Sequence, residues 1–206
     1  PWGSAETTMP VAAEFAVANV AAAMAALLSL GHSLREVTDA VACMTPVPGR
    51  MQVIDAGSPY PRVIVDYAHT PDALEKTLAA LRPQCRGELI CLVGCGGDRD
   101  RGKRGQMGLA AVKGSDRVWF TSDNPRSEDP SAIIHDMLEP LKNPDSSRVY
   151  RQADRAKAIA EAIESAGADD ILLIAGKGHE QTQEINGEFL PFSDFAIVDQ
   201  LQSGKN

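Results

Sequence analysis

Positive charge is in short supply in this sequence. Its 206 residues include 20 Lys and Arg against 28 Asp and Glu, which gives a net charge of −8. Proteins bind the phosphate backbone through Lys and Arg, so we do not expect nucleic acid to be the main ligand. Any anionic small molecule must then be bound by a few local basic side chains.

The sequence also lacks a long apolar run and a CxxC motif. Its longest apolar stretch, "VANVAAAMAALLSL", is too short for a membrane span and contains Asn19, and the N-terminus has no basic flank of a signal peptide. We therefore expect a cytoplasmic protein with no membrane partner, and we expect it to be a monomer. The cysteines are interpreted as reduced thiols in or near the core; they are Cys43, Cys85, Cys91 and Cys95.

The first part of the chain is predicted to be helical. An alanine-rich pattern predicts a helix over residues 12–31, and Ser33 with Glu36 forms a capping box that begins a second helix. The prolines and glycine of residues 45–51, "TPVPGRM", indicate a boundary. We interpret residues 1–47 as the C-terminal remnant of a preceding domain whose other part is missing.

Strands and helices alternate from residue 48 to the end. Residues 90–93 and 171–174 are continuous apolar runs, which are typical of parallel strands covered on both faces. Residues 48–206 are therefore predicted to form an α/β domain, a doubly wound and mostly parallel sheet with helices on both faces. Asn186 and Gly187, between two short extended runs, predict a hairpin added at the sheet edge.

Four polar loops follow the predicted parallel strands. In an open parallel sheet, ligands bind outside the carboxyl ends of the strands, so these loops are expected to contribute to one site. They are "DYAHTPD" (66–72), "GCGGDRDRGKR" (94–104), "SDNPRSE" (122–128) and "GKGHE" (176–180).

The second loop resembles a P-loop only in part. Gly97, Gly102 and Lys103 are in register with G-x-x-x-x-G-K-[ST], but Arg104 replaces the hydroxyl residue that should hold magnesium. The dinucleotide fingerprint G-x-G-x-x-G fails as well, because Arg99 occupies the place of its third glycine. A stand-alone nucleotide hydrolase is therefore disfavoured, and a flexible solvated loop remains an alternative.

The other loops also allow structural interpretations. Asp66 and Thr70 could be capping groups, with His69 a surface residue of the same turn. The segment 176–180 could be a tight turn with a charged rim. Metal binding by its His and Glu is not expected, since no third ligand stands at a helical spacing from them.

Five motifs, in this order and spacing, resemble the C-terminal domain of the Mur ligases. They are "GRM", "DYAHTPDAL", "GCGGDRDRGKR", "DNPRSEDP" and "AGKGHEQTQ". The resemblance extends over about residues 15–200 and is strongest to members that add 2,6-diaminopimelate in peptidoglycan synthesis. It implies an ATP-dependent amide-bond ligase, which activates the carboxylate of UDP-MurNAc-L-Ala-D-Glu as an acyl phosphate for attack by the amine of meso-diaminopimelate. It also implies that residues 1–47 end the central ATP-binding domain.

The resemblance implies a diaminopimelate pocket with opposite charges at its two ends. Arg99 and Arg126 would bind carboxylates, since planar guanidinium groups match them bidentately. Ammonium groups would be received by Asp123, Asn124 and Glu180 together with the Gly176 backbone. Lysine lacks the distal carboxylate, so binding lysine would leave Arg126 desolvated without a partner.

The resemblance also implies a nucleotide-binding group. Arg50 would contact phosphate or ribose, Asp66 the ribose hydroxyls, and Asn19 and His69 would complete the group. Ala16 replaces the first asparagine of the family motif F-N-x-x-N, which puts the adenine contact in doubt.

The chain is expected to contain no catalytic residue, no P-loop and no metal ligand. ATP and Mg²⁺ would be held mainly by the missing central domain, and the chain alone would be inactive. The alternative is a free-standing amino-acid or nucleotide-binding module without catalysis.

Overall fold

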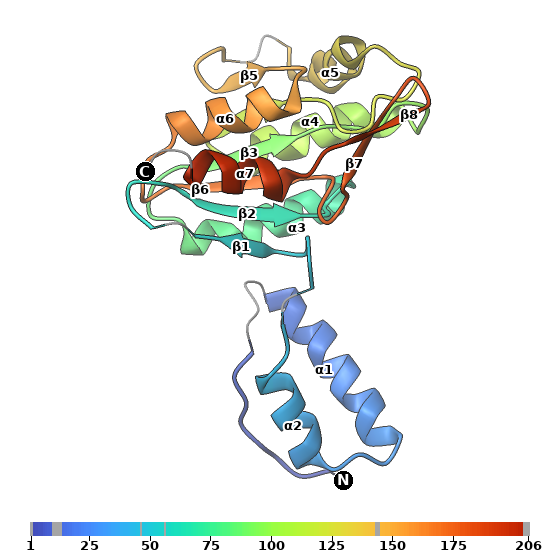
Figure 1. The fold of residues 1–206 in the computed structure, drawn as a ribbon, viewed down its shortest axis with the longest axis vertical. Helices are drawn as coiled ribbons and strands as arrows, with labels where there is room; N and C mark the ends of the chain where they lie inside the picture. Colours follow the sequence, from blue (N-terminus) through green and yellow to red (C-terminus); the bar gives the residue numbers. More distant parts are fainter. Residues whose placement is uncertain (1, 10–13, 46, 56, 143–144, 204–206) are drawn as a thin grey trace. The chain divides into compact units, whose positions relative to one another are not determined.

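The computed structural model describes residues 2–9, 14–45, 47–55, 57–142 and 145–203. By its internal contacts the chain divides into two compact units, residues 1–47 and residues 48–206, and each is described by itself. Figure 1 shows the elements of both units. No helix among the described residues has the length and apolar character needed to cross a bilayer.

The first unit contains the two helices that the sequence predicts, α1 (Glu14–Ser29) and α2 (Leu34–Ala42). The predicted capping box is confirmed, because the Ser33 hydroxyl accepts from the Glu36 amide and the Glu36 carboxylate accepts from the Ser33 amide. Residues 12 and 13 of the first predicted helix lie outside the described residues. Cys43 is exposed, so the interpretation of all four cysteines as core or near-core thiols is wrong for this one.

The second unit is built on a six-stranded sheet with the strand order β1-β2-β6-β3-β4-β5. Only β1 is antiparallel to its neighbour, so the predicted doubly wound and mostly parallel fold is confirmed. The strands are β1 (Gln52–Ile54), β2 (Arg62–Asp66), β3 (Leu89–Val93), β4 (Arg117–Phe120), β5 (Val149–Arg151) and β6 (Ile171–Ala175).

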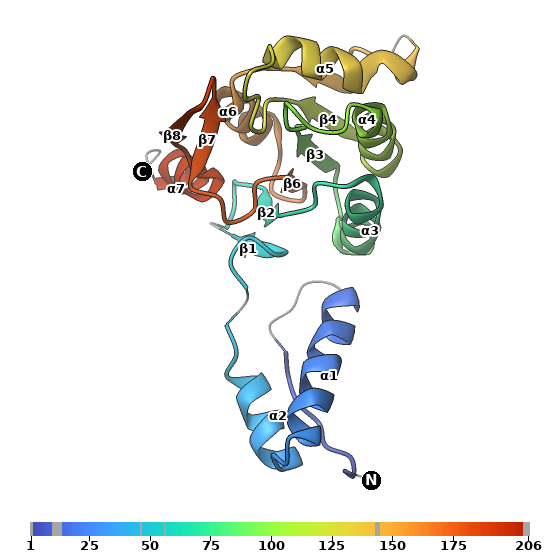
Figure 2. The same cartoon turned by 90° about the vertical axis from the view of Figure 1, so that its right-hand side faces the viewer.

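Helices cover both faces of this sheet (Figures 1 and 2). One face carries α3 (Pro71–Leu81), α4 (Gly102–Gly114) and α5 (Pro130–Leu138). The other carries α6 (Arg155–Ser165) and α7 (Asp194–Ser203). Side chains alternate along each strand, so the fully buried strands β3 and β6 supply apolar groups to both layers.

The predicted hairpin exists, but its predicted place is wrong. Strands β7 (Thr182–Ile185) and β8 (Glu188–Pro191) form a separate two-stranded sheet, turned by two residues with positive φ, Asn186 and Gly187. The main sheet already has β1 and β5 at its edges, whereas β6 lies within it. The chain therefore leaves the carboxyl end of a central strand, and the hairpin pairs with the loop after β4 through Arg126 and Ile185.

A buried ion pair joins α6 and α7. Arg155 donates from Nε and Nη2 to the two carboxylate oxygens of Asp194, both at 2.8 Å, and both side chains are completely buried. Its other N–H groups reach the carbonyls of Ser122 and Ala175, which follow and end strands β4 and β6. The pair therefore holds two helices to the carboxyl edge of the sheet.

A second buried arginine explains why the near-match to a P-loop ends in Arg104. This guanidinium donates two hydrogen bonds to Glu128, of 3.0 and 2.7 Å, and one of 2.8 Å to Asp136 in α5. Its side chain is 1% exposed. Arg104 thus fastens α4 to the loop after β4, and its charge is compensated within the fold.

We predict that Asp194→Ala lowers the free energy of unfolding by about 3–5 kcal/mol, because it leaves the buried Arg155 without its carboxylate. Urea denaturation measures this loss. The matched control is Asp72→Ala, which breaks the exposed Lys76 pair on α3 and should cost about 0–1 kcal/mol. A loss for Asp194→Ala as small as that of the control would contradict the prediction.

We predict that Glu128 makes the free energy of unfolding depend on pH. Hydrogen bonds from Arg104 and the Asp98 amide lower the pKa of Glu128 from 4.5 to about 2. A depressed pKa in the folded state gives stability that is present above pH 4.5 and is lost as the pH falls toward 2.

Urea midpoints of wild type and Glu128→Gln, measured from neutral to strongly acidic pH, should therefore differ most at neutral pH and converge in acid. The exposed Glu75→Gln on α3 is the control. A difference between wild type and Glu128→Gln that stayed constant with pH would refute this role.

Candidate functional site

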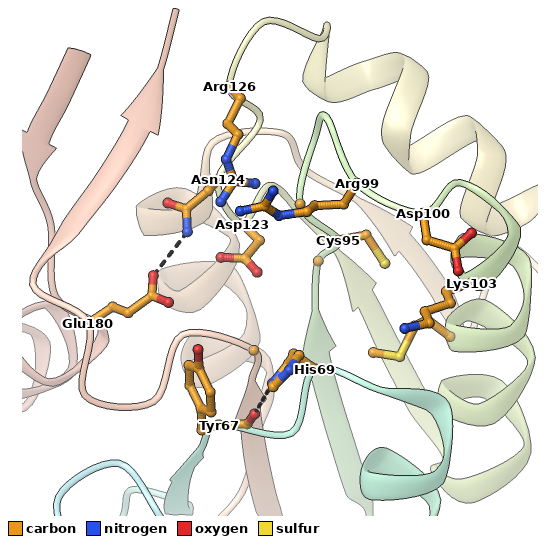
Figure 3. A pocket seen from close by; sticks show the side chains of 14 residues that line it. Tyr67, His69, Cys95, Arg99, Asp100, Lys103, Asp123, Asn124, Arg126 and Glu180 are labelled. Atoms are coloured by element: carbon orange, nitrogen blue, oxygen red, sulfur yellow. Dashed lines mark hydrogen bonds between the residues drawn. The ribbon is translucent and has the colours of Figure 1, made fainter. Parts of the chain in front are cut away.

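A cavity of about 390 Å³ lies at the carboxyl ends of the parallel strands. All six residues that the sequence assigns to the amino-acid pocket line it, and they come from three different loops: Arg99, Asp123, Asn124, Arg126, Gly176 and Glu180. Figure 3 shows the Arg99 and Arg126 side chains on one side of the cavity and those of Asn124 and Glu180 on the other. Asp123 lies between the two groups. The structure thus brings the predicted residues together, and their ligand remains a proposal.

The glycines of the loop after β3 allow it to lie against the loop after β4. A Cβ atom added to Gly97 would stand 1.9 Å from the Pro125 carbonyl oxygen, so no side chain fits there. The Gly97 amide donates to the Asn124 carbonyl at 2.9 Å. These contacts show that Gly97 serves the packing of two loops.

Arg126 is held in an unusual backbone conformation by the hairpin. Its φ of 52° lies in the left-handed region, which costs a residue with a side chain roughly 1–2 kcal/mol. Two backbone bonds offset this cost: the Arg126 amide donates to Glu184, and the Asn186 amide donates to Arg126. The Arg126 side chain is oriented by an ion pair of 2.9 Å with Glu184 and by a hydrogen bond of 2.8 Å that it donates to the Gly97 carbonyl.

This arrangement corrects one expectation about lysine. Arg126 has Glu184 and the Gly97 carbonyl as partners within the protein, so lysine would not leave it without a partner. Arg99 is different, because it is exposed and makes no hydrogen bond or ion pair with the other residues that the structure describes. Arg99 is therefore the guanidinium with its full hydrogen-bonding capacity free for a ligand.

Lys177 is a buried cation in contact with three residues that line the cavity, and sequence reasoning did not assign it. Its side chain is completely buried, and its ammonium group lies 2.9 Å from Glu180 Oε2 and 3.0 Å from Asn124 Oδ1. The nearest Asp123 oxygen is 3.5 Å away. The available signal was a charged residue between two glycines, directly after a fully apolar strand.

The side chain of Asn124 is oriented by three partners. Its Oδ1 accepts from Lys177 and from the Glu184 amide, and its Nδ2 donates to Glu180 at 3.0 Å. The amide oxygen is thus occupied inside the protein. The capacity left for a ligand is the second N–H of Nδ2, which suits a carboxylate and not the ammonium group that we expected.

The two acids of the cavity have pKa values shifted in opposite directions. Burial raises the pKa of Asp123 although Arg155 and Lys177 act to lower it, and its Oδ1 has no hydrogen-bond partner among the described residues. Burial also acts on Glu180, but hydrogen bonds from Lys177 and Asn124 outweigh it and lower the pKa. The environment of Glu180 thus favours its ionised form, while Asp123 Oδ1 has an ion-pair contact of 3.5 Å with Lys177 and no hydrogen-bond donor in the described part of the chain.

Two of the residues assigned to the nucleotide lie near this cavity. His69 lines it, and its Nδ1 is 2.8 Å from the Tyr67 carbonyl oxygen. Tyr67 lines the cavity too, and the guanidinium carbon of Arg50 lies 4.7 Å from the centre of its ring. His69 therefore lines the same cavity as the amino-acid residues, and its nucleotide role stays a prediction.

The other two residues of that group are placed differently. Asp66 is buried, and its two oxygens accept from the Met51 and Ala68 amides at 2.7 and 2.9 Å. The capping interpretation holds for Thr70, which is the N-cap of α3, and not for Asp66. Asn19 is an exposed residue of α1 in the first unit. Their nucleotide roles stay predictions.

Comparisons with known proteins agree with this architecture. Residues 49–178 match the family model described as Mur ligase, glutamate ligase domain. Proteins named UDP-N-acetylmuramoyl-L-alanyl-D-glutamate--2,6-diaminopimelate ligase are 47% identical over 94% of this chain in Coxiella burnetii and 49% identical over 97% in Neisseria meningitidis serogroup A. The chain spans 39% and 40% of the length of these two relatives.

Solved structures show the same relationship. A structure of a UDP-N-acetylmuramoyl-L-alanyl-D-glutamate--2,6-diaminopimelate ligase matches 98% of this chain, and 41% of its own, at 43% identity with a TM-score of 0.73. A UDP-N-acetylmuramate-alanine ligase from Thermotoga maritima, at 22% identity and a TM-score of 0.67, shares the fold. With its parallel sheet, its cavity and these matches, the chain belongs to the Mur ligase family.

Proposed function

We propose that this chain binds meso-2,6-diaminopimelate as part of an ATP-dependent ligase that joins this amino acid to UDP-MurNAc-L-Ala-D-Glu. The observation that carries the proposal is one cavity lined both by the guanidinium groups of Arg99 and Arg126 and by the carboxylates of Asp123 and Glu180. The names of the relatives, 47% and 49% identical, support the same substrate. The alternative of a separate binding module has no observation of its own in its favour.

The charges of the cavity suit a ligand that bears carboxylate and ammonium groups together. Arg99, Arg126 and the free N–H of Asn124 can donate to a carboxylate. Asp123 and Glu180 can accept from an ammonium group. The cavity is also of the size usual for small-molecule sites, about 300–1,000 Å³.

The work of these residues in the proposed reaction is positioning. One amine of diaminopimelate must reach the acyl phosphate, and fixing the amino acid by its far end orients that amine for attack. Arg126 suits this task because its backbone and side chain are both fixed before the ligand arrives. Such preorganisation avoids the entropy that ordering a mobile side chain would cost.

The nucleotide side of the site is part of the same proposal. Arg50, whose side chain is exposed, is free to contact phosphate or ribose. The nucleotide contacts of His69, and of Asn19 in the first unit, are separate proposals for each unit. A ribose contact by Asp66 would use oxygens that already accept backbone bonds. The described residues contain no group of three potential ligands that could hold a metal, so we assign no Mg²⁺ ligand to them.

Isothermal titration calorimetry with meso-diaminopimelate tests the proposal. We expect Arg126→Ala to weaken binding roughly tenfold to hundredfold, because a hydrogen bond between charged groups contributes about 1.5–3 kcal/mol. Affinity for ATP should stay unchanged. L-lysine, which lacks one carboxylate, should bind wild type more weakly than diaminopimelate does.

Arg151→Ala is the matched control, since this exposed arginine ends β5 and does not line the cavity. An equal loss for diaminopimelate and ATP in Arg126→Ala would argue against the assigned role. Failure of the wild-type chain to bind diaminopimelate would refute the substrate itself.

A further inference from the structure

Lys177 is a cation that the proposed ligand contacts do not use. It belongs to the loop after β6, and its completely buried side chain contacts Asp123 and Asn124 of the loop after β4 and Glu180 of its own loop. An ammonium group has three N–H donors. Two are used by Asn124 and Glu180, and the nearest oxygen for the third belongs to Asp123 at 3.5 Å. The three side-chain oxygens that contact Lys177 thus belong to residues that line the cavity.

Lys177 helps to determine the orientation of the Asn124 side-chain amide. An Asn side chain can turn over and exchange the places of its oxygen and nitrogen. Lys177 can only donate, and so can the Glu184 amide, and both meet the same atom of Asn124. That atom must be the oxygen, so the nitrogen is directed to Glu180 with one N–H left over for the cavity.

Lys177 also offsets negative charge at Asp123 and Glu180. Asp123 and Glu180 are two carboxylates close to one cation, and without Lys177 their repulsion would favour protonation of one of them. Arg155 is the other cation acting on both, but it is already paired with Asp194. Lys177 therefore offsets one of the two negative charges and leaves one for the ammonium group of a ligand.

We propose that Lys177 is a positioning residue for the amino-acid substrate: it fixes the donor side of Asn124 toward the carboxylate of the ligand and keeps Glu180 ionised for its ammonium group. This inference rests on the proposed function, because it assumes diaminopimelate as the ligand. It requires no contact between Lys177 and the substrate.

The test is the substitution Lys177→Met, which keeps the length of the side chain and removes its charge. Calorimetry should show diaminopimelate binding weakened roughly tenfold to hundredfold, the loss that follows when ligand contacts are misdirected. ATP affinity should be unchanged. Lys76→Met, at an exposed lysine of α3, is the matched control and should bind as wild type does.

A second measurement uses the wild-type protein and does not depend on whether the variant folds. In ¹⁵N-detected spectra, the Lys177 ammonium should give a signal protected from solvent exchange that shifts as diaminopimelate saturates the cavity. A lysine that served stability alone would give a signal that the ligand leaves in place.

The outcomes separate the two proposals. Wild type that binds diaminopimelate, together with a Lys177→Met variant of equal affinity or a Lys177 signal that does not move on saturation, overturns the role of Lys177 and leaves the proposed function standing. Wild type that fails to bind diaminopimelate overturns both.

Discussion

Two carboxylates that line one small cavity repel each other, and a cation held close to both offsets this repulsion. Here Lys177 is that cation, and the site is arranged around it. Its ammonium group connects Asp123 and Asn124 on one loop with Glu180 on another, so the two loops share a single charge centre. Arg155 is a second buried cation that is paired with a carboxylate, and it ties α6 and α7 to the ends of two strands. The geometry of the pocket thus follows from compensating buried charge.

The architecture could be predicted from the sequence because its signals are local. Continuous apolar runs occur where both faces of a sheet are covered, and the two runs at residues 90–93 and 171–174 lie within β3 and β6. The hairpin was foreseen from Asn186 and Gly187, but its position was not. The position of the hairpin depends on the pairing of Ile185 with Arg126, some sixty residues earlier in the chain. A local sequence pattern does not predict such a long-range pairing.

The site could be predicted only to the level of which residues meet. All six pocket residues follow parallel strands, and the carboxyl ends of such strands share one edge, so their meeting was foreseeable. Their hydrogen-bonding roles were not. Asn124 turned out to be a donor because Lys177 and the Glu184 amide occupy its oxygen, and both partners lie more than fifty residues away in the chain. A sequence motif identifies the residue, whereas its hydrogen-bond partners in the fold determine which donors and acceptors remain for a ligand.

The loop after β3 shows the same principle acting on charge. Its basic residues suggest an anion site, and the spacing approaches that of a P-loop. Arg101 and Arg104 are both paired with Glu128, so their charges are compensated before any ligand arrives. What remains toward the cavity is Arg99 and Lys103, neither of which has an ion-pair partner among the described residues. A basic loop in a protein of net charge −8 therefore presents only the fraction of its charge that the fold has not already used. At the cavity that fraction is one guanidinium group, of Arg99, and one ammonium group, of Lys103.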